Sequence, residues 1–320
     1  MEGGGAGRFR VVRCIQLLED SELYQARDPD GGFVAVKIAR SESIEPMRQR
    51  LAGEATILEQ LSGASSPRLL DRGVHDGRPY LALQWISGID AVSVSAERRE
   101  QGDRQGLLAL LIEVTEAYVA IHGHGVLHGD VHPGNLLVDG NGRVTLIDFG
   151  LAQAGPASGG MPRGGVGFFM EPEHANALLE RRRPPPLTPD GEQFAVAALL
   201  YMLATGQHYM DFTLQQEEML RQICAARPVP FAERGLDAWP ALDGVLARAL
   251  AVDPAARYRE MQALAEALRE IAKPPAVPAI RAADGAEALL GGMLDHLRLD
   301  GDLYRNGLGS GPLCSVNFGA

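Results

Sequence analysis

The residues best suited to chemistry lie in one stretch, residues 121–152, which reads IHGHGVLHGDVHPGNLLVDGNGRVTLIDFGLA. Three of its side chains, Asp130, Asn135 and Asp148, present oxygen atoms at close spacing. Oxygen ligands of this kind suit Mg²⁺, which proteins bind through one or two carboxylates together with substrate phosphates. The stretch therefore indicates magnesium-assisted chemistry on a phosphate group.

Two short strands are expected to position these oxygens. Residues 136–138 and 144–147 are apolar, and the turn sequence DGNG separates them. This pattern predicts a β-hairpin closed by a Gly/Asn turn. Because Asn135 comes directly before the hairpin and Asp148 directly after it, the fold should bring both close to Asp130.

Two motifs in the stretch resemble a known family. His128-Gly129-Asp130, followed by Asn135, is similar to the catalytic loop of eukaryotic-type (Hanks) Ser/Thr protein kinases, and Asp148-Phe149-Gly150 is similar to their metal-binding triplet. The resemblance implies that Asp130 accepts or orients the proton of a substrate hydroxyl, while Asn135 and Asp148 hold Mg²⁺ on ATP. The competing interpretation is a chance acidic hairpin in a Rossmann-like domain.

An isolated lysine marks a second part of the expected site. Lys37 is the one charged residue in the apolar strand predicted over 33–38, where an unpaired charge would be costly. The sequence VAVK is similar to the kinase strand whose lysine contacts the α- and β-phosphates of ATP. Its expected partner is Glu54, on a helix predicted over 46–61, and Glu59 is the competing acid.

The resemblance implies an α+β, bilobal protein-kinase fold. Residues 8–88 should form a small β-rich N-lobe with one main helix, and residues 89–272 should form a larger helical C-lobe. The segment 81–86 is similar to the hinge strand of the family. Backbone groups of Gln84 and Ile86 are therefore expected to bind the adenine edge.

The loop expected to cover the ATP phosphates departs from the family. Kinases carry glycines there, because a backbone without side chains can lie close over the phosphates. The matching positions hold Gln16, Leu18 and Ser21, and the acids Glu19 and Asp20 add negative charge. This departure predicts weakened nucleotide binding, though not loss of the reaction.

Two further substitutions bear on mechanism. Gly129 stands where the family usually has an Arg that contacts a phosphate on the activation loop, so activity without loop phosphorylation is expected.

His132 stands where a Lys usually contacts the γ-phosphate, and a His carries only part of that charge at neutral pH. A His132 that only packs or faces solvent is the alternative.

The segment after the triplet resembles a peptide-binding region. Glu171-Pro172-Glu173 is similar to the Ala-Pro-Glu that closes a kinase activation segment, and Glu173 is expected to pair with Arg257.

The run Arg181-Arg182-Arg183 is the one basic run in an acidic chain. It is either a solvated loop or a clamp for an acidic or phosphorylated peptide.

Composition limits the partners. A formal net charge of -11 over 320 residues argues against nucleic acid and against an anionic membrane. The cysteines, Cys14, Cys224 and Cys314, lie far apart and indicate reduced thiols in the cytoplasm rather than disulfides or a zinc site. Residues 1–7 are Gly-rich without the apolar core of a signal peptide, and are expected to be a linker or an expression remnant.

A narrower resemblance suggests a substrate. Residues 164–212 are similar to the kinase domain of class III and class IV lanthipeptide synthetases, and the tail GPLCSVNFGA is similar to the start of their lanthionine cyclase domain. Residues 273–320 are therefore expected to hold a linker helix and a truncated cyclase-like start. In that family the kinase phosphorylates Ser and Thr of a precursor peptide, and lyase and cyclase domains, fused or associated, complete the reaction.

Three other function classes remain open. A free-standing bacterial signalling kinase would share the same core, the sequence HGDVHPGN suggests a small-molecule phosphotransferase of the aminoglycoside type, and the missing glycines suggest a nucleotide-binding pseudokinase. The expected ion pair of the activation segment argues against the second class. The complete set of phosphate- and metal-binding residues argues against the third.

Overall fold

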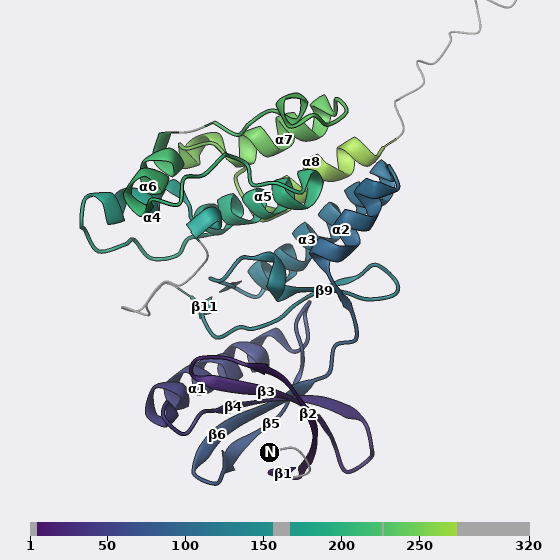
Figure 1. Cartoon of the computed structure of the whole chain (residues 1–320), viewed down its shortest axis with the longest axis vertical. Coiled ribbons are helices and arrows are strands. Elements are labelled where there is room, and N and C mark those ends of the chain that lie inside the picture. Colours follow the sequence, from purple (N-terminus) through teal and green to yellow (C-terminus); the bar gives the residue numbers. More distant parts are fainter. Residues whose placement is uncertain (1–4, 156–166, 226, 274–320) are drawn as a thin grey trace, which may run out of the picture. The chain divides into compact units, whose positions relative to one another are not determined.

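The protein is seen here as a computed structural model that describes residues 5–155, 167–225 and 227–273 (Figure 1). Its first part is a six-stranded antiparallel sheet with the order β1-β2-β3-β4-β6-β5, and helix α1 (Ile44–Leu61) lies beside it. The strands are β1 (Gly5–Ala6), β2 (Phe9–Leu17), β3 (Ser21–Arg27), β4 (Phe33–Ala39), β5 (Leu69–His75) and β6 (Arg78–Gln84).

Strand β4 shows how the sheet separates apolar and charged side chains. Successive residues of a strand point to opposite faces. Val34, Val36 and Ile38 are therefore buried together in the apolar core on one face of the sheet. Lys37, one residue out of step, faces α1 instead and meets a carboxylate there.

Two N-terminal expectations are wrong. Gly5 and Ala6 belong to the sheet rather than to a linker, because the turn at Gly7, with φ +59°, folds them back onto β2. The loop expected around Gln16, Leu18 and Ser21 is also shorter, since pairing between β2 and β3 continues as far as Leu17 and Glu22. Only a tight turn remains at the end of this hairpin.

The part that follows β6 is mainly helical. Its helices are α2 (Ala91–Glu100), α3 (Arg104–Gly123), α4 (Pro172–Leu179), α5 (Pro189–Thr205), α6 (Gln216–Ala225), α7 (Pro240–Ala249) and α8 (Met261–Ala272). Its short strands are β7 (Ile89–Asp90), β8 (Val126–Leu127), β9 (Leu136–Val138), β10 (Val144–Leu146) and β11 (Gln153–Ala154). The predicted linker helix and cyclase-like start, beyond Lys273, lie outside the described residues.

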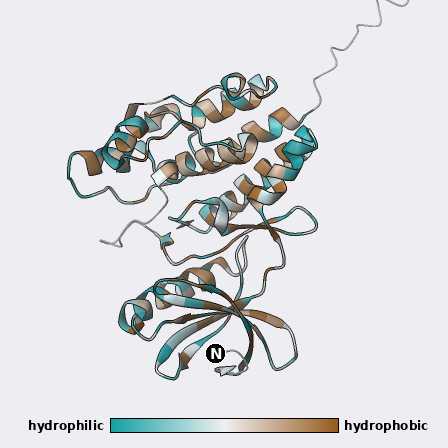
Figure 2. Cartoon of the chain, in the orientation of Figure 1, coloured by the Kyte–Doolittle hydropathy of each residue, from teal (hydrophilic) through white to brown (hydrophobic). Residues whose placement is uncertain are grey.

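Helices α5 and α2 differ strongly in how many of their residues are buried. Helix α5 is buried on nearly all sides, as its continuous apolar sequence predicts. Helix α2 was not expected, because only Ala91 and Ser95 are buried and no apolar periodicity results. It begins where the Asp90 carboxylate accepts the Ser93 amide at 2.8 Å. Figure 2 shows the hydrophilic turns of α2 beside the mostly apolar α5.

Helix α3 is long and apolar enough to cross a membrane by length and composition, when the described residues are searched. In the structure its residues Leu111, Val114, Tyr118 and Ile121 are fully buried in the protein core. The helix packs against α5 and α8. Its apolar character is therefore accounted for by packing within the protein.

Candidate active site

The β9–β10 hairpin forms as predicted and sets the spacing of the oxygen ligands. The carboxylate of Asp139 accepts two backbone amides of the turn, at 2.8 and 3.0 Å, which fixes the closed end. At the open end the Ile147 amide donates to the Asn135 carbonyl at 3.0 Å. Asn135 and Asp148 are thus held next to each other by the backbone of one hairpin.

Lys37 lies between two carboxylates. Its Nζ atom is 2.8 Å from Oε2 of Glu54 on α1 and 2.7 Å from Oδ1 of Asp148. Burial lowers the pKa of Lys37, but the two carboxylates outweigh this effect and raise it above the usual value. The competing acid, Glu59, lies at an exposed position 3.5 Å from Arg72. The lysine is therefore charged at neutral pH and joined to the hairpin.

The pKa of Asp148 is lowered by the same ion pair that raises the pKa of Lys37. Burial raises the pKa of its carboxyl, and the charge and hydrogen bond of Lys37 more than offset this, so the pKa lies below 3.8. Its backbone has φ +61°, a left-handed conformation that is uncommon outside glycine. The Gly150 amide donates to the same Oδ1 atom at 3.3 Å. These contacts fix an ionised carboxylate at the end of the hairpin.

Asp130 lies on the loop before the hairpin and is held by Asn135. The Asn135 Nδ2 atom donates to the Asp130 carbonyl at 3.0 Å and to its Oδ2 at 3.1 Å. Burial raises the pKa of Asp130, while the nearby imidazole of His132 and the hydrogen bond from Asn135 lower it, and the net pKa is below 3.8. The carboxylate is ionised at neutral pH and can accept or orient a proton.

A fully buried acid holds the backbone of this loop through a hydrogen bond. Glu192, on α5, accepts the Gly129 amide at 2.8 Å with Oε1 and contacts His122 Nε2 at 2.6 Å with Oε2. Burial raises the pKa of Glu192, but the hydrogen bond from His122 and its charge hold it below 4.5. The backbone on the N-terminal side of Asp130 is thus bonded to the central helix.

The structure explains the glycine that replaces the family arginine. Gly129 has φ +76°, a backbone conformation that favours glycine. A Cβ atom there would lie 2.5 Å from the carbonyl oxygen of Leu151. A side chain at position 129 would therefore need both a strained backbone and a displaced neighbouring segment.

His132 has a defined orientation. Its Nδ1 atom accepts the Gly134 amide at 3.1 Å, so the proton of the neutral ring belongs on Nε2. Nε2 lies 3.6 Å from Oδ2 of Asp130. The ring therefore caps the short turn that leads to Asn135 and presents an N–H group toward Asp130.

Asn135 and Asp148 fit a Mg²⁺ ion. Asn135 uses its Nδ2 atom on Asp130, and its Oδ1 accepts no hydrogen bond from the described residues; Asp148 uses Oδ1 on Lys37 and keeps Oδ2. In the described part of the chain no group of three or more His, Cys, Asp or Glu side chains could hold a metal. Two oxygen donors are nevertheless sufficient where substrate phosphates complete the ligands.

The expected hinge follows the end of β6. The Gln84 amide donates to the Arg68 carbonyl at 2.9 Å, and its side chain accepts the Arg68 amide at 3.3 Å. Ile86, two residues further on, lies outside the sheet and makes no hydrogen bond to the residues described here. Its backbone groups are thus free to bind a ligand edge.

The structure brings Glu173 and Arg257 together. Arg257 Nη2 lies 3.0 and 3.1 Å from the two carboxylate oxygens of Glu173, and the arginine side chain is fully buried. It also donates to the carbonyls of Asp190 and Ala251, at 2.9 and 2.8 Å. This pair fixes α4 to the loop before α8.

The basic run follows α4 and is exposed. Arg182 pairs with Glu180, whereas Arg181 and Arg183 have no ionic partner among the described residues. Arg181 has φ +52°, where the chain turns away from the helix. Two of the three predicted clamp residues therefore face solvent without a counter-charge in this part of the chain.

Arg50 is not among the site residues predicted from the sequence, although its side chain lies close to Lys37. It contacts the Asp20 carboxylate in the β2–β3 turn. A methyl group built on Gly150 would lie 3.6 Å from Lys37 Nζ and 3.7 Å from Arg50 Nη2, so both cations reach the same place. The signal in the sequence is the spacing of four residues to Glu54, which puts both on one face of the helix.

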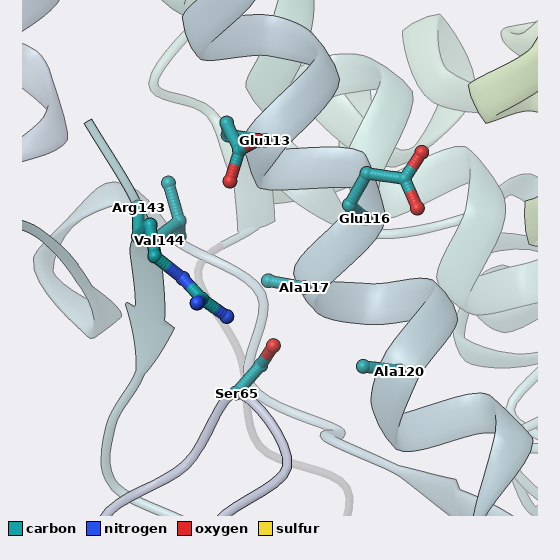
Figure 3. A pocket seen from close by; sticks show the side chains of 7 residues that line it. All are labelled: Ser65, Glu113, Glu116, Ala117, Ala120, Arg143 and Val144. Carbon is teal, nitrogen blue, oxygen red and sulfur yellow. The ribbon is translucent and has the colours of Figure 1, made fainter. Parts of the chain in front are cut away.

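A cavity of about 440 Å³ lies elsewhere, between α3, the start of β10 and the loop after α1. Figure 3 shows the Arg143 guanidinium and Ser65 hydroxyl beside this cavity, with the Glu116 carboxylate turned away from it. Glu116 pairs with Arg269. None of the predicted site residues lines this cavity, so it is separate from the Lys37 cluster.

The comparisons with known proteins agree with this geometry. The family profile described as "Protein kinase domain" matches residues 19–268. The serine/threonine-protein kinase PknL of Mycobacterium tuberculosis is 28% identical over 285 residues, which cover 83% of this chain and 69% of that protein.

Two further relatives come from other bacteria. The probable serine/threonine-protein kinase CPE1738 of Clostridium perfringens is 25% identical over 276 residues, 84% of this chain and 39% of that protein. The DNA damage-responsive serine/threonine-protein kinase RqkA of Deinococcus radiodurans is 26% identical over 252 residues, 77% of this chain and 36% of that protein. With the family profile matching most of its length, the chain belongs to the protein kinase family.

Proposed function

We propose that this protein transfers the γ-phosphate of ATP to Ser or Thr hydroxyls of protein substrates, as a bacterial signalling kinase. The observation that carries the proposal is the contact of Lys37 with both Glu54 and Asp148. The Asp130–Asn135 pair lies on the loop next to it. The bacterial relatives, all named as serine/threonine-protein kinases, favour this class over a lanthipeptide synthetase.

The charges assign a role to each side chain. Lys37 contacts the α- and β-phosphates, and Glu54 holds its ammonium in place. Asp130, ionised because its pKa is low, orients the substrate hydroxyl and receives its proton. His132 donates its Nε2 proton toward the transferred phosphate or toward Asp130. Positioning and charge neutralisation of this kind supply most of the rate in phosphoryl transfer.

Asn135 and Asp148 would hold Mg²⁺, which neutralises charge on the β- and γ-phosphates when bound. Backbone groups of Ile86 would bind the adenine edge, whereas the Gln84 amide already donates to the Arg68 carbonyl. On the substrate side, Arg181 and Arg183 are exposed cations that suit an acidic or phosphorylated peptide.

Two further features complete the proposal. Because Gly129 stands in place of an arginine, no side chain at that position can bind a phosphate on the activation loop. The kinase therefore acts without loop phosphorylation. The acidic chain and its separated cysteines favour a cytoplasmic enzyme without nucleic acid or membrane partners.

A lanthipeptide precursor is the second candidate substrate. It rests on the sequence of residues 164–212 and on the tail GPLCSVNFGA, which lies outside the described residues. In that case the phosphorylated Ser or Thr would pass to lyase and cyclase domains, fused or associated. A short Ser/Cys-rich precursor encoded beside this protein would favour it.

The test is phosphorylation by the full chain, followed by mass spectrometry. The protein is incubated with ATP, Mg²⁺ and one of three acceptors: Ser/Thr peptides, a Ser/Cys-rich precursor-type peptide, or an aminoglycoside. Peptide phosphorylation that disappears in Asp130→Asn is the expected result. Transfer to the aminoglycoside alone, or equal transfer by Asp130→Asn, would overturn the proposal.

A further inference from the structure

The turn between β2 and β3 contains no glycine, and two arginines hold it, one directly after β4 and one on α1. The Arg40 amide donates to the Asp20 carbonyl at 2.9 Å, and Arg40 Nη1 donates to the Leu18 carbonyl at 3.3 Å. Arg50, from α1, pairs with the Asp20 carboxylate. The turn is closed by its own Leu18 amide, which donates to the Ser21 carbonyl at 2.9 Å, and the two arginines fix its position against the rest of the protein.

Arg50 also lies at the proposed phosphate site. Its Nη2 atom, Lys37 Nζ and Asp148 Oδ1 all fall within 3.7 Å of one point, the position of a methyl group on Gly150. Helix α1 thus brings one acid to Lys37, Glu54, and one cation to the space beside it. The Arg50 guanidinium, paired with Asp20, thus lies between the turn and Gly150, beside the lysine that is proposed to contact the nucleotide phosphates.

We propose that Arg50 is a phosphate-binding residue that Asp20 holds ready in the free protein and releases to the terminal phosphate of ATP. The proposal rests on the proposed kinase function. It accounts for a nucleotide site without the glycines whose backbone amides would otherwise approach the phosphates. One side chain from α1 replaces part of that contact.

The exchange is chemically reasonable. The side chains of Arg50 and Asp20 are 40% and 30% exposed, so their ion pair is worth little and is inexpensive to break. A terminal phosphate carries more charge than one carboxylate, and a guanidinium matches its oxygens in pairs. Released Asp20 can turn to solvent, while Arg40 keeps the backbone of the turn in place.

Nucleotide binding to matched variants tests the assignment. Calorimetry gives the Kd of MgATP, MgADP and AMP for the parent, Arg50→Gln, Asp20→Asn and the double variant. Arg48→Gln is the control for Arg50, because it removes the same charge from a half-exposed position of the same helix, where Arg48 lies 3.5 Å from Glu45. Glu19→Gln is the control for Asp20, because it removes the neighbouring negative charge.

The two single variants should act in opposite directions. Arg50→Gln should weaken MgATP binding about tenfold, as expected for the loss of one charged hydrogen-bond partner, weaken MgADP less and leave AMP unchanged. Asp20→Asn should tighten MgATP binding more than Glu19→Gln does. That extra gain should vanish when Arg50 is already Gln.

Three results would overturn the assignment. If Arg50→Gln and Asp20→Asn both weaken binding, the pair only holds the turn. If Arg50→Gln behaves like Arg48→Gln, Arg50 does not contact phosphate. If Asp20→Asn has the same effect with and without Arg50, only its charge at a distance matters. A parent protein that binds none of the nucleotides would instead refute the proposed function, and this inference with it.

Discussion

Two hairpins contribute to the site, and they are built differently. The β9–β10 hairpin keeps the residues typical of the family, and its own backbone holds Asn135 beside Asp148. The β2–β3 hairpin has lost the family's glycines, and Arg40 and Arg50, from other elements, hold its turn. The comparison teaches that one local hairpin can position the residues of the proposed metal site, whereas side chains from distant parts of the chain hold the turn that is proposed to cover the phosphates.

The largest effect should follow a change at the end of the β9–β10 hairpin. Asp148→Asn removes the charge that pairs with Lys37 and that would hold Mg²⁺, so the phosphorylation rate should fall about 10²- to 10³-fold. Steady-state kinetics with ATP measure it. Asp139→Asn, the same change at the closed end of the same hairpin, is the control and should keep most activity. Equal losses in both variants would show a folding defect.

The next effect should come from the acid shared by Lys37 and α1. Glu54→Gln removes a buried carboxylate 2.8 Å from Lys37, and kcat/KM for ATP should fall about 10- to 100-fold, because a charged hydrogen bond is worth roughly 1.5–3 kcal/mol. Glu59→Gln, on the exposed side of the same helix, should change it little. Indistinguishable kinetics for the two variants would contradict the choice of Glu54.

The next prediction concerns pH and Glu192, the buried acid that holds the loop before the β9–β10 hairpin. The pKa of Glu192 is held below 4.5 in the folded protein, so its ionised form stabilises the fold above that pH, and the stabilisation is lost as pH falls through the folded pKa. Denaturant unfolding should therefore show a shallower loss of unfolding free energy below pH 4.5 in Glu192→Gln than in the parent. The exposed Glu233→Gln should follow the parent curve.

The smallest effect should come from restoring a glycine. Leu18→Gly returns one family residue to the β2–β3 turn, yet Arg40 and Arg50 already fix this turn. KM for ATP should change by less than about threefold, since a glycine in a held position mainly adds freedom to the unfolded chain. A tenfold gain in affinity would show that the missing glycines, and not the arginines, limit binding.

The sequence alone supports the prediction of features that depend on local pattern. The hairpin turn, the strand with Lys37 and the continuous apolar sequence of α5 all follow from spacing and hydrophobicity. The choice of Glu54 over Glu59 rests only on the resemblance to the family. Helix α2 could not be predicted from periodicity, because it buries only two of its residues and depends on the Asp90 cap.

Contacts between distant segments were the part that could not be predicted. Arg50 looks like an ordinary helix-surface cation until β2 and β3 bring Asp20 to it. Gly5 and Ala6 look like linker residues until the chain folds back to bury Ala6 completely. In both cases the deciding interaction joins residues whose proximity depends on the tertiary fold.

The glycine before Asp130 limits how this enzyme could evolve. At Gly129 the backbone is left-handed, and the Leu151 carbonyl occupies the space that a β-carbon needs. A single substitution to arginine would therefore not fit at this position, because the neighbouring segment would first have to move. Regulation that depends on an arginine at this position would thus need at least one compensating change elsewhere in the chain.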